Sequence, residues 1–535
     1  MSAPAGEGAR RDALDPAAAG DASGRGGGSA QTLVTPDDAH NRALVANVHP
    51  PGRPNPTPDG RYNLVVVGAG TAGLVAAMGA AGLGAKVALV ERALTGGDCL
   101  NHGCVPSKAL LRSAHAAHEA RVAWETGAYG VRLAAAPRVD FGEVMAQMRR
   151  LRAEISANDS VARLEAAGVD VYLGHGAFVG ADALEVDGRR LRFRRAVLAT
   201  GARAAVPPIP GLAESGYLTN ETLFSLTELP RRLVIIGAGP IGCEMAQAFR
   251  RFGSEVVVVS LDAQVLPHDD PDAAARVKAR LEREGVRLRL GADVTEVARR
   301  GDDTIVRFDR GGGAEQVQGD ALLLAVGRTP NVDGLGLDAA GVEVDRTGVV
   351  VDDRLRTANR RIYASGDVAS AYKFTHAADA MSRLVLQNAL FFGRKRASAL
   401  CIPWCTFTDP AVAHVGLQAR EAAERGVEIG TYTVGLDEVD RAILDGETEG
   451  FARIHVHARS GRIVGATLVA RHAGDMMGEV VLAMTEGLRV GALSTAIAPY
   501  PTEGEVWKKL GDAHQRSRLG PRLAAFLRRY FGWVR

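Results

Sequence analysis

The sequence lacks any apolar run near the length needed to cross a membrane, which takes about 18 residues or more. Residues 1–30 are mainly Ala, Gly, Ser and charged residues, without the hydrophobic segment that a secretory signal requires. Neither sign of charge predominates, since 64 Lys and Arg against 62 Asp and Glu leave a net charge of +2. These absences predict a cytoplasmic protein and offer no support for nucleic-acid binding.

Cysteine is also scarce, with five in 535 residues, yet Cys99 and Cys104 stand close together in the stretch GGDCLNHGCVPSK. A disulfide needs Cα atoms about 4.4–6.8 Å apart, closer than residues five apart on a regular helix, so a turn must join the two. Gly103 suits that turn, and Pro106 suits the first turn of a following helix whose N-terminus would stabilise a thiolate at Cys104. We interpret the two as a redox pair, because structural disulfides are uncommon inside cells; a zinc site and two buried cysteines are the alternatives.

A glycine-rich turn lies just before this pair. An apolar strand ends at Gly68, a helix is predicted over 74–83, and a second apolar strand ends in a glutamate. The turn has GxGxxG spacing, and Glu91 lies 23 residues beyond its first glycine. Such a turn places a pyrophosphate over the N–H groups at the helix start, and the acid suits a ribose hydroxyl. We expect a dinucleotide site made by Gly68, Gly70, Gly73 and Glu91.

The same arrangement recurs downstream. The apolar residues 233–236 run into a second glycine turn, which is followed by a predicted helix and by the strand 255–259. Its glycines are Gly237, Gly239 and Gly242. The chain therefore has two dinucleotide sites, with a thiol pair just after the first. This order predicts an electron path from nicotinamide to flavin to disulfide.

Together these motifs resemble the FAD-dependent pyridine nucleotide–disulfide oxidoreductases, a family that includes glutathione reductase, dihydrolipoamide dehydrogenase and mercuric reductase. The resemblance covers roughly residues 61–515, and three further motifs support it: Ala199-Thr200-Gly201, Gly327-Arg328-Thr329-Pro330-Asn331 and Ala364-Ser365-Gly366-Asp367. It implies an α/β fold with two Rossmann-like dinucleotide-binding domains, for FAD and NAD(P), and a C-terminal α+β interface domain. The interface domain is expected to form a homodimer in which each chain completes the partner's active site.

Composition at the two ends of the chain and the resemblance between them predict how the chain is divided. The predicted parts are a disordered tail and extended lead-in (1–60, extended over 36–61), a split FAD-binding domain (61–204 and 330–399), an NAD(P)-binding domain (205–329), an interface domain (400–517) and a basic amphipathic helix (518–535).

Residue roles follow from the family's mechanism. The resemblance makes Cys99 the thiol that meets the substrate and Cys104 the thiol next to the flavin. It places Lys108 near the flavin and pairs it with Glu244, for which an unrelated surface ion pair is the alternative. The FAD residues it implies are Gly68, Gly70, Gly73, Glu91, Lys108, Gly176, Thr200, Gly201, Asp367 and Thr375. The NAD(P) residues are Gly237, Gly239, Gly242, Ser260, Val294 and Gly327.

The helix expected to begin at Thr375 would stabilise negative charge on a reduced flavin through its N-terminal dipole. For His376, capping or packing there is favoured over catalysis. Ser260 stands where a carboxylate would favour NADH, but Asp262 is close enough to oppose a 2′-phosphate, so both NADH and NADPH stay open.

The substrate prediction depends on the stretch Tyr500-Pro501-Thr502-Glu503-Gly504-Glu505, which resembles the family's His-Pro-Thr-x-x-Glu. Tyr500 takes the place of the histidine, and Glu505 keeps the place of the glutamate. A phenol with a pKa near 10 transfers protons poorly at neutral pH, which disfavours dithiol substrates. Tyrosine here is similar to mercuric reductases, so a thiophilic metal ion such as Hg(II) is the first candidate, with Cys99 and Cys104 as transient ligands and no permanently bound metal.

Two features depart from the well-known mercuric reductases: no cysteine follows Cys405, and no Cys-x-x-Cys motif precedes the first glycine turn. The alternative is an enzyme like dihydrolipoamide dehydrogenase or glutathione reductase, acting on a small disulfide or dithiol. Cys401 and Cys405 would point to one side of a strand; a metal relay is one interpretation, and buried structural cysteines are favoured.

The C-terminal residues suggest a different class of function. Apolar side chains at helical spacing are interleaved with arginines: Leu523, Phe526, Leu527, Tyr530, Phe531 and Val534 with Arg522, Arg528, Arg529 and Arg535. Packing on the protein's own dimer is favoured, and peripheral membrane contact is the alternative. The latter fits a membrane-surface flavoprotein electron carrier. A redox-sensing binding module is a further alternative, against which the intact electron path argues.

Overall fold

The structure, a computed structural model, describes residues 34–535. The disordered tail predicted for residues 1–30 lies outside the described residues. The extended lead-in predicted over 36–61 is wrong in part, because α1 (Ala39–Val48) is a helix. Asp38 caps it by accepting a hydrogen bond from the N–H of Asn41, and Leu44 packs against Leu100. The prolines that suggested an extended chain lie at 50–58, beyond this helix.

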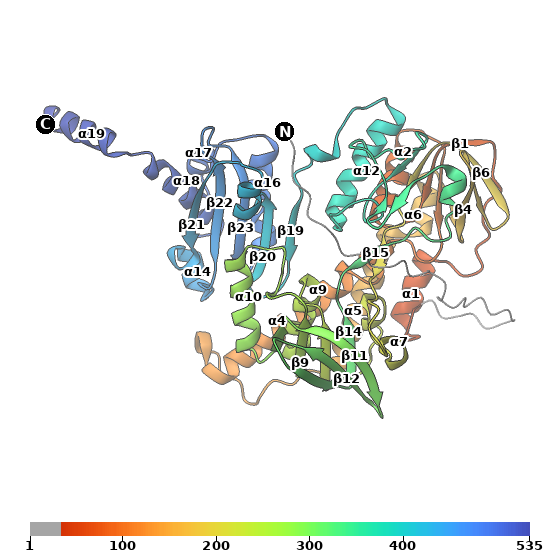
Figure 1. Cartoon of the computed structure of the whole chain (residues 1–535), viewed down its shortest axis with the longest axis horizontal. Helices are drawn as coiled ribbons and strands as arrows, with labels where there is room; N and C mark the ends of the chain where they lie inside the picture. Colours follow the sequence, from red (N-terminus) through yellow and green to blue (C-terminus); the bar gives the residue numbers. More distant parts are fainter. Residues whose placement is uncertain (1–33) are drawn as a thin grey trace. The chain divides into compact units, whose positions relative to one another are not determined.

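The first sheet has seven strands, in the order β3-β2-β1-β6-β5-β4 with β18 also paired to β6 (Figure 1). Its side chains alternate between two apolar cores: Leu64 and Val66 face α2 (Thr71–Gly82) and α12 (Thr375–Leu390), whereas Val65 and Val67 face the other side. The strands are β1 (Arg61–Val67), β2 (Val87–Glu91), β3 (Val169–Leu173), β4 (Gly176–Gly180), β5 (Ala183–Val186), β6 (Arg189–Leu198) and β18 (Ile362–Ala364).

A second, parallel sheet has the order β10-β9-β8-β14. One face packs on α9 (Pro240–Phe252) and α10 (Pro271–Arg283), and the other on a three-stranded antiparallel sheet. The parallel strands are β8 (Arg232–Ile236), β9 (Glu255–Ser260), β10 (Arg287–Leu290) and β14 (Ala321–Leu324). The antiparallel strands are β11 (Asp293–Arg300), β12 (Asp303–Asp309) and β13 (Ala314–Gly319). The chain passes between the first and second sheets through an antiparallel pair, β7 (Ala202–Ala204) and β15 (Arg328–Pro330).

The third sheet is antiparallel, in the order β19-β20-β23-β22-β21. Its core includes the buried Trp507 of α18 (Glu505–Ser517). The strands are β19 (Pro403–Thr406), β20 (Ala411–Gly416), β21 (Ile429–Gly435), β22 (Phe451–His457) and β23 (Ile463–Ala470). The predicted α/β class, with two nucleotide-binding sheets and a C-terminal α+β domain, is confirmed.

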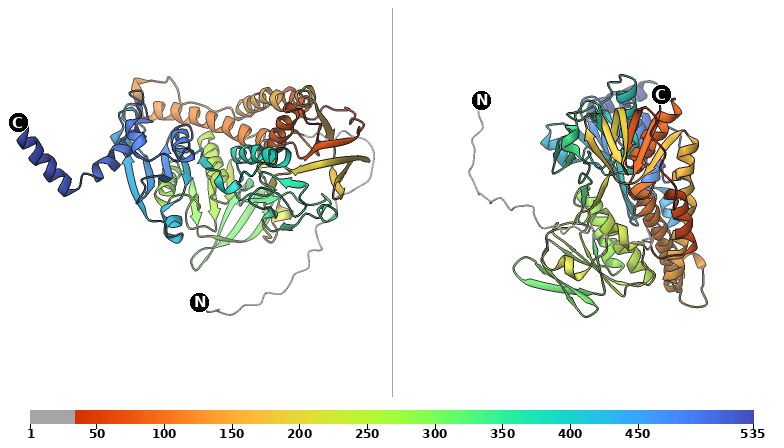
Figure 2. Two further views of the ribbon diagram at one scale, coloured as in Figure 1. Left: turned by 90° about the horizontal axis from the view of Figure 1, so that it is seen from above. Right: turned by 90° about the vertical axis from the view of Figure 1, so that its right-hand side faces the viewer.

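The long helix α4 (Cys104–Thr126) connects the first domain to the third (Figure 2). Glu119 near its C-terminal end pairs with Arg471 just after β23, and the Tyr129 hydroxyl donates to the carbonyl oxygen of Asp445 at 2.6 Å. One end of this helix therefore carries Cys104, and the other contacts the interface domain.

No helix within residues 34–535 is long and apolar enough to span a bilayer. The basic helix predicted at 518–535 is present as α19 (Pro521–Trp533).

Candidate active site

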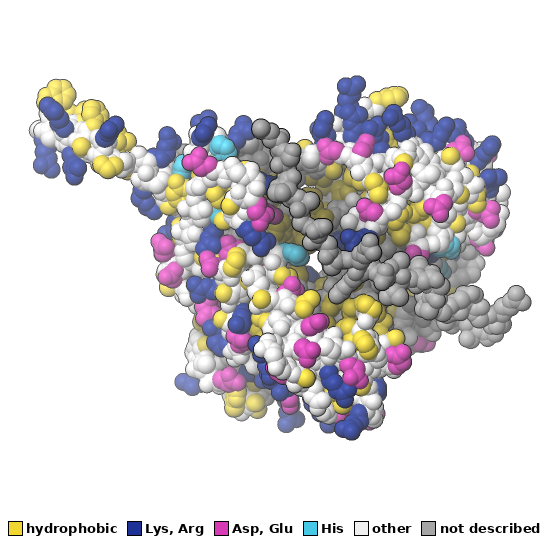
Figure 3. Space-filling view, in the orientation of Figure 1, with side chains coloured by type: hydrophobic (Ala, Val, Ile, Leu, Met, Phe, Trp, Pro, Cys, Tyr) yellow, Lys and Arg dark blue, Asp and Glu magenta, His cyan; other side chains and the backbone are white. Residues whose placement is uncertain are grey.

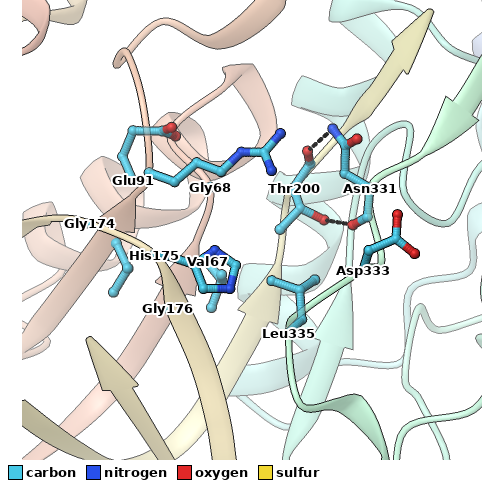
Figure 4. A pocket seen from close by; sticks show the side chains of 12 residues that line it. Val67, Gly68, Glu91, Gly174, His175, Gly176, Thr200, Asn331, Asp333 and Leu335 are labelled. Carbon is cyan, nitrogen blue, oxygen red and sulfur yellow. Dashed lines mark hydrogen bonds between the residues drawn. The ribbon is translucent and has the colours of Figure 1, made fainter. Parts of the chain in front are cut away.

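The glycine turn after β1 borders a cavity (Figure 4). Gly68 has a φ of +100°, and a Cβ at Gly73 would clash with the carbonyl oxygen of Gly68, so the turn requires glycine. Glu91 at the end of β2 accepts hydrogen bonds from the N–H groups of Ala69 and Ala93, both at 2.7 Å. Burial raises the pKa of Glu91. The cavity is lined by Gly68, Glu91, Gly174, His175, Gly176, Thr200, Asn331 and Asp333, among others.

A glycine turn, a carboxylate and a concave wall of backbone fit the adenosine half of a bound FAD. The far wall is held by Thr200, whose hydroxyl donates to the Asn331 carbonyl at 2.7 Å while the Asn331 amide donates back at 2.9 Å. Gly201 follows directly. Beyond it, Asp367 lies 3.7 Å from Arg328, and burial raises the pKa of Asp367.

The second glycine turn repeats the first. Gly237 has a φ of +109°, and a Cβ at Gly242 would clash with the Gly237 carbonyl oxygen. Ser260 ends β9, is buried, and lies 3.5 Å from a carboxylate oxygen of Asp262. Gly239 caps α9, Val294 lies on β11, and Gly327 follows β14. The arrangement fits the pyrophosphate of NAD(P)H and leaves the ribose site without a carboxylate at position 260.

The two predicted redox cysteines lie on two consecutive helices joined by a turn. Cys99 lies on α3 (Gly97–Asn101), and Cys104 is the first residue of α4. A Cβ at Gly103 would come within 3.0 Å of Asp98, so glycine permits the turn to close, and Pro106 lies in the first turn of α4. Both cysteines are present as thiols, and they hydrogen-bond each other.

The surroundings of the pair give Cys99 and Cys104 different pKa values. The hydrogen bond from Cys99, the hydroxyl of Thr375 at 3.4 Å and the charge of Lys108 together lower the pKa of Cys104 to about 6, against a smaller opposing effect of desolvation. The same hydrogen bond to Cys104, together with burial, raises the pKa of Cys99. The reduced pair therefore carries its thiolate on Cys104 at neutral pH.

We expect Thr375→Val to raise the pKa of Cys104, because valine keeps the shape of threonine but removes the hydroxyl that donates to the thiolate. In the wild type the thiolate should be lost as the pH falls through about 6, and in the variant at a higher pH. The pH dependence of thiolate absorbance in the reduced protein measures this. Thr375→Ser keeps the hydroxyl and should titrate as the wild type does; equal curves for valine and serine would contradict the assigned hydrogen bond.

Lys108 extends from α4 to α9. Its Nζ donates to Oε2 of the buried Glu244 at 2.8 Å and lies 4.6 Å above the ring of Phe407. The backbone N–H of Phe407 donates to the other oxygen, Oε1, at 2.9 Å. The structure thus brings together the predicted lysine and glutamate. The backbone of Phe407, in a third segment, also binds the Glu244 carboxylate.

Comparison with known proteins decides the family. Residues 62–382 match the family described as pyridine nucleotide-disulphide oxidoreductase, and residues 402–510 match its dimerisation domain. The chain belongs to this family. It is an FAD- and NAD(P)H-dependent disulfide oxidoreductase with a dimerisation domain that supports homodimer formation.

Among curated relatives, the chain is similar to a mercuric reductase of Bacillus cereus, with 36% identity over 445 residues that cover 83% of this chain and 70% of the relative. It is 33% identical to a dihydrolipoyl dehydrogenase of Chlamydia muridarum over 83% of this chain and 95% of that one. Among solved structures, a Cu(II) complex of a variant of the HOCl-induced flavoprotein disulfide reductase RclA from Escherichia coli matches with a TM-score of 0.76 and 28% identity, covering 85% of this chain and 99% of the other.

In this oxidoreductase, the predicted C-terminal pair is not joined within the described chain. The Tyr500 hydroxyl donates to Oδ2 of Asp440 at 2.8 Å, and the side chain is 72% exposed. The hydrogen bond to Asp440 raises the pKa of Tyr500. Glu505 instead begins α18, 4.0 Å from Lys509.

A histidine–glutamate pair that sequence reasoning missed lies in the same domain. Nδ1 of His472 is 3.2 Å from Oε2 of Glu503, and this hydrogen bond raises the pKa of His472. Glu503 sits inside the Tyr500–Glu505 stretch, but nothing in the sequence links it to a histidine 31 residues earlier. Only the fold brings the end of β23 beside this loop.

The remaining cysteines do not form a second ionised pair. Cys405 lies on β19, whereas Cys401 precedes the strand, and both pack against the core of the interface domain. Burial raises the pKa of Cys405 to about 12 and also raises that of Cys401. Both are protonated at neutral pH, which favours a structural role over a metal relay. His376 likewise packs, with Nε2 2.6 Å from the carbonyl oxygen of Pro403.

Proposed function

We propose that this enzyme passes electrons from NAD(P)H through FAD and the Cys99–Cys104 disulfide to a thiophilic metal ion, with Hg(II) as the first candidate. The observation that carries the proposal is the state of Tyr500, whose hydroxyl is bound to Asp440 and whose pKa is raised. At neutral pH such a phenol does not donate its proton. A thiolate that leaves a disulfide substrate requires a proton donor. A metal ion requires none, and soft Hg(II) prefers thiolate ligands.

A bound FAD would supply the hydride-accepting chemistry and two electrons for the disulfide beside it. At neutral pH the disulfide takes up these two electrons and one proton, which gives a thiol at Cys99 and a thiolate at Cys104. Both sulfurs then bind the metal ion and the Cys99 proton is released; the two sulfurs give up two electrons, which reduce Hg(II) to Hg(0), and the S–S bond forms again. Within the chain, Cys104 holds the thiolate, Thr375 and Lys108 stabilise it, and Glu244 fixes the position of Lys108.

The proposal includes the site and domain assignments made from the sequence. The first glycine turn binds FAD together with Glu91, Gly176, Thr200, Gly201 and Asp367. The second glycine turn binds NAD(P) together with Ser260, Val294 and Gly327. The FAD domain comprises 61–204 and 330–399, the NAD(P) domain 205–329 and the interface domain 400–517. We further propose a cytoplasmic homodimer in which Tyr500 and Glu505 of each chain lie at the partner's thiols.

A second candidate is the reduction of a small disulfide, favoured by His472. An imidazole whose pKa is raised by Glu503 can hold and release a proton near neutral pH. If this pair reaches the partner's thiols in the dimer, it would supply the proton transfer that Tyr500 does not.

Steady-state oxidation of NADPH and of NADH distinguishes the two candidates, with Hg(II) under excess thiol, Cu(II), lipoamide and oxidised glutathione each offered as acceptor. We expect rapid turnover with Hg(II) and slow turnover with either disulfide. Tyr500→His should raise disulfide turnover by about tenfold or more, since a positioned acid–base group contributes about 10²–10⁴-fold, while Tyr500→Phe should not. Rapid disulfide turnover in the wild type that His472→Ala abolishes would overturn the metal-ion proposal and establish the second candidate.

A further inference from the structure

The helix α19 lies outside the part of the chain that defines the family. The dimerisation-domain match ends at residue 510, and α19 begins at Pro521. None of its residues is buried, so the rest of the described chain gives it no apolar partner. An isolated helix of this length is marginal in water, which means that its apolar face calls for a partner.

One face of α19 is apolar and aromatic. Phe526 is 64%, Phe531 58% and Trp533 82% exposed. Leu523 and Tyr530 share this face, because they stand at i, i+3, i+4, i+7 and i+8 positions together with Phe526, Leu527 and Phe531. Aromatic rings with a polar edge, such as those of Tyr and Trp, favour the boundary between lipid headgroups and acyl chains.

The other side of α19 carries charge of one sign only. Arg522, Arg528 and Arg529 lie on it, and no Asp or Glu follows Asp512 in the sequence. Figure 3 shows the helix with hydrophobic and basic side chains and no acidic ones. A surface that binds α19 must therefore offer both negatively charged groups and an apolar layer that the aromatic rings can enter.

A second copy of α19 fits poorly, because pairing two apolar faces would bring the flanking arginines of both helices together without a carboxylate to separate them. A membrane-spanning role is excluded by length, since 13 residues extend about 20 Å and the hydrocarbon core is about 30 Å thick. An anionic lipid surface meets both requirements: the rings enter the headgroup region, and the guanidinium groups pair with lipid phosphates.

We propose that α19 lies flat on an anionic lipid bilayer and holds this oxidoreductase at the membrane surface. The inference concerns where the enzyme works and is independent of its electron acceptor. Arg516 and Arg518, which precede the helix, add charge beside the same surface.

Flotation of the purified, flavin-loaded full chain with lipid vesicles tests the proposal. We expect binding to phosphatidylcholine vesicles that contain about 30% phosphatidylglycerol, and at least about tenfold weaker binding to phosphatidylcholine alone. The triple variant F526S/F531S/W533S and the charge reversal R522E/R528E/R529E should each weaken binding to the anionic vesicles by about tenfold or more. Raising the salt concentration should also weaken it.

Two control variants match these changes elsewhere on the surface. R190E/R192E/R194E alters the net charge equally at three exposed arginines of β6, and L83S/F392S removes exposed apolar groups outside the helix. Both should bind as the wild type does, and all variants should oxidise NAD(P)H in solution at the wild-type rate. Failure of the full chain to float with anionic vesicles would overturn the proposal. So would loss of the dimer on removal of residues 520–535, since α19 would then be a contact between subunits.

Discussion

Replacing Cys104 by serine should lower NAD(P)H-dependent reduction of the acceptor by at least about a thousandfold, because loss of a covalent nucleophile removes the chemical step rather than weakening it. Serine is similar in size and keeps a hydrogen-bond partner for Thr375, so the fold should be unaffected. Its hydroxyl does not form a disulfide and is not ionised at neutral pH. Bleaching of the flavin absorbance by NAD(P)H should persist in the variant, because that half of the path precedes the thiols.

The comparison of the two half-reactions locates the defect. Cys401→Ser makes the same chemical change at a half-buried thiol outside the pair and should keep turnover within about threefold of wild type, as is usual for substitutions away from a reacting centre. If Cys104→Ser keeps substantial turnover with Hg(II), the electrons do not pass through this pair, and the assignment of the redox centre is wrong.

Replacing Arg251 by alanine should lower the free energy of unfolding by about 3–5 kcal/mol, the usual cost of breaking a buried ion pair from one side. Arg251 lies on α9, is 1% exposed, and donates to Glu284 at 2.6 and 2.8 Å and to Asp409 at 2.7 Å. Without the guanidinium, two carboxylates remain buried close together, and the nearest opposite charge is Arg280, 3.9 Å from Glu284. The three residues join α9, the end of α10 and the start of the interface domain, so the whole chain should be affected.

Urea unfolding followed by flavin and tryptophan fluorescence measures this loss. Arg287→Ala is the matched control, since Arg287 pairs with Glu255 at 3.3 Å but both side chains are more than half exposed; its effect should stay below about 1 kcal/mol. An Arg251 variant as stable as the Arg287 variant would mean that water enters the cluster and screens the two carboxylates.

The parts of this fold that the sequence predicts are those where one short segment determines its own geometry. The turns at Gly68 and Gly237 admit only glycine, and the strands and helices on either side follow from apolar periodicity. The turn between Cys99 and Cys104 is of the same kind, since Gly103 lies inside it and Pro106 lies in the first turn of the helix that follows. Chemistry at such sites depends on backbone that is specified locally.

The features that the sequence did not predict depend on packing between distant segments. Residues 39–48 form α1, whose Leu44 and Val48 are buried in an apolar cluster with Leu100 and Ala153, more than 50 positions away. The sequence analysis singled out Tyr500, but its hydrogen bond to Asp440 joins residues 60 positions apart. The cluster at Arg251 spans 158 positions between donor and acceptor. Propensity and spacing carry no information about such pairs.

The position of Glu244 has a consequence for protein engineering. Its carboxylate joins α9 to Lys108 of α4 and to the backbone of Phe407, so three domains meet at a single side chain. In a chimera whose NAD(P) domain comes from another member of the family, the donor therefore supplies the residue at position 244. That residue must position Lys108, which comes from the recipient. Donors with a carboxylate at this point of α9 keep both contacts, whereas a donor with an apolar residue there removes the ion pair of Lys108 and the acceptor of the Phe407 N–H.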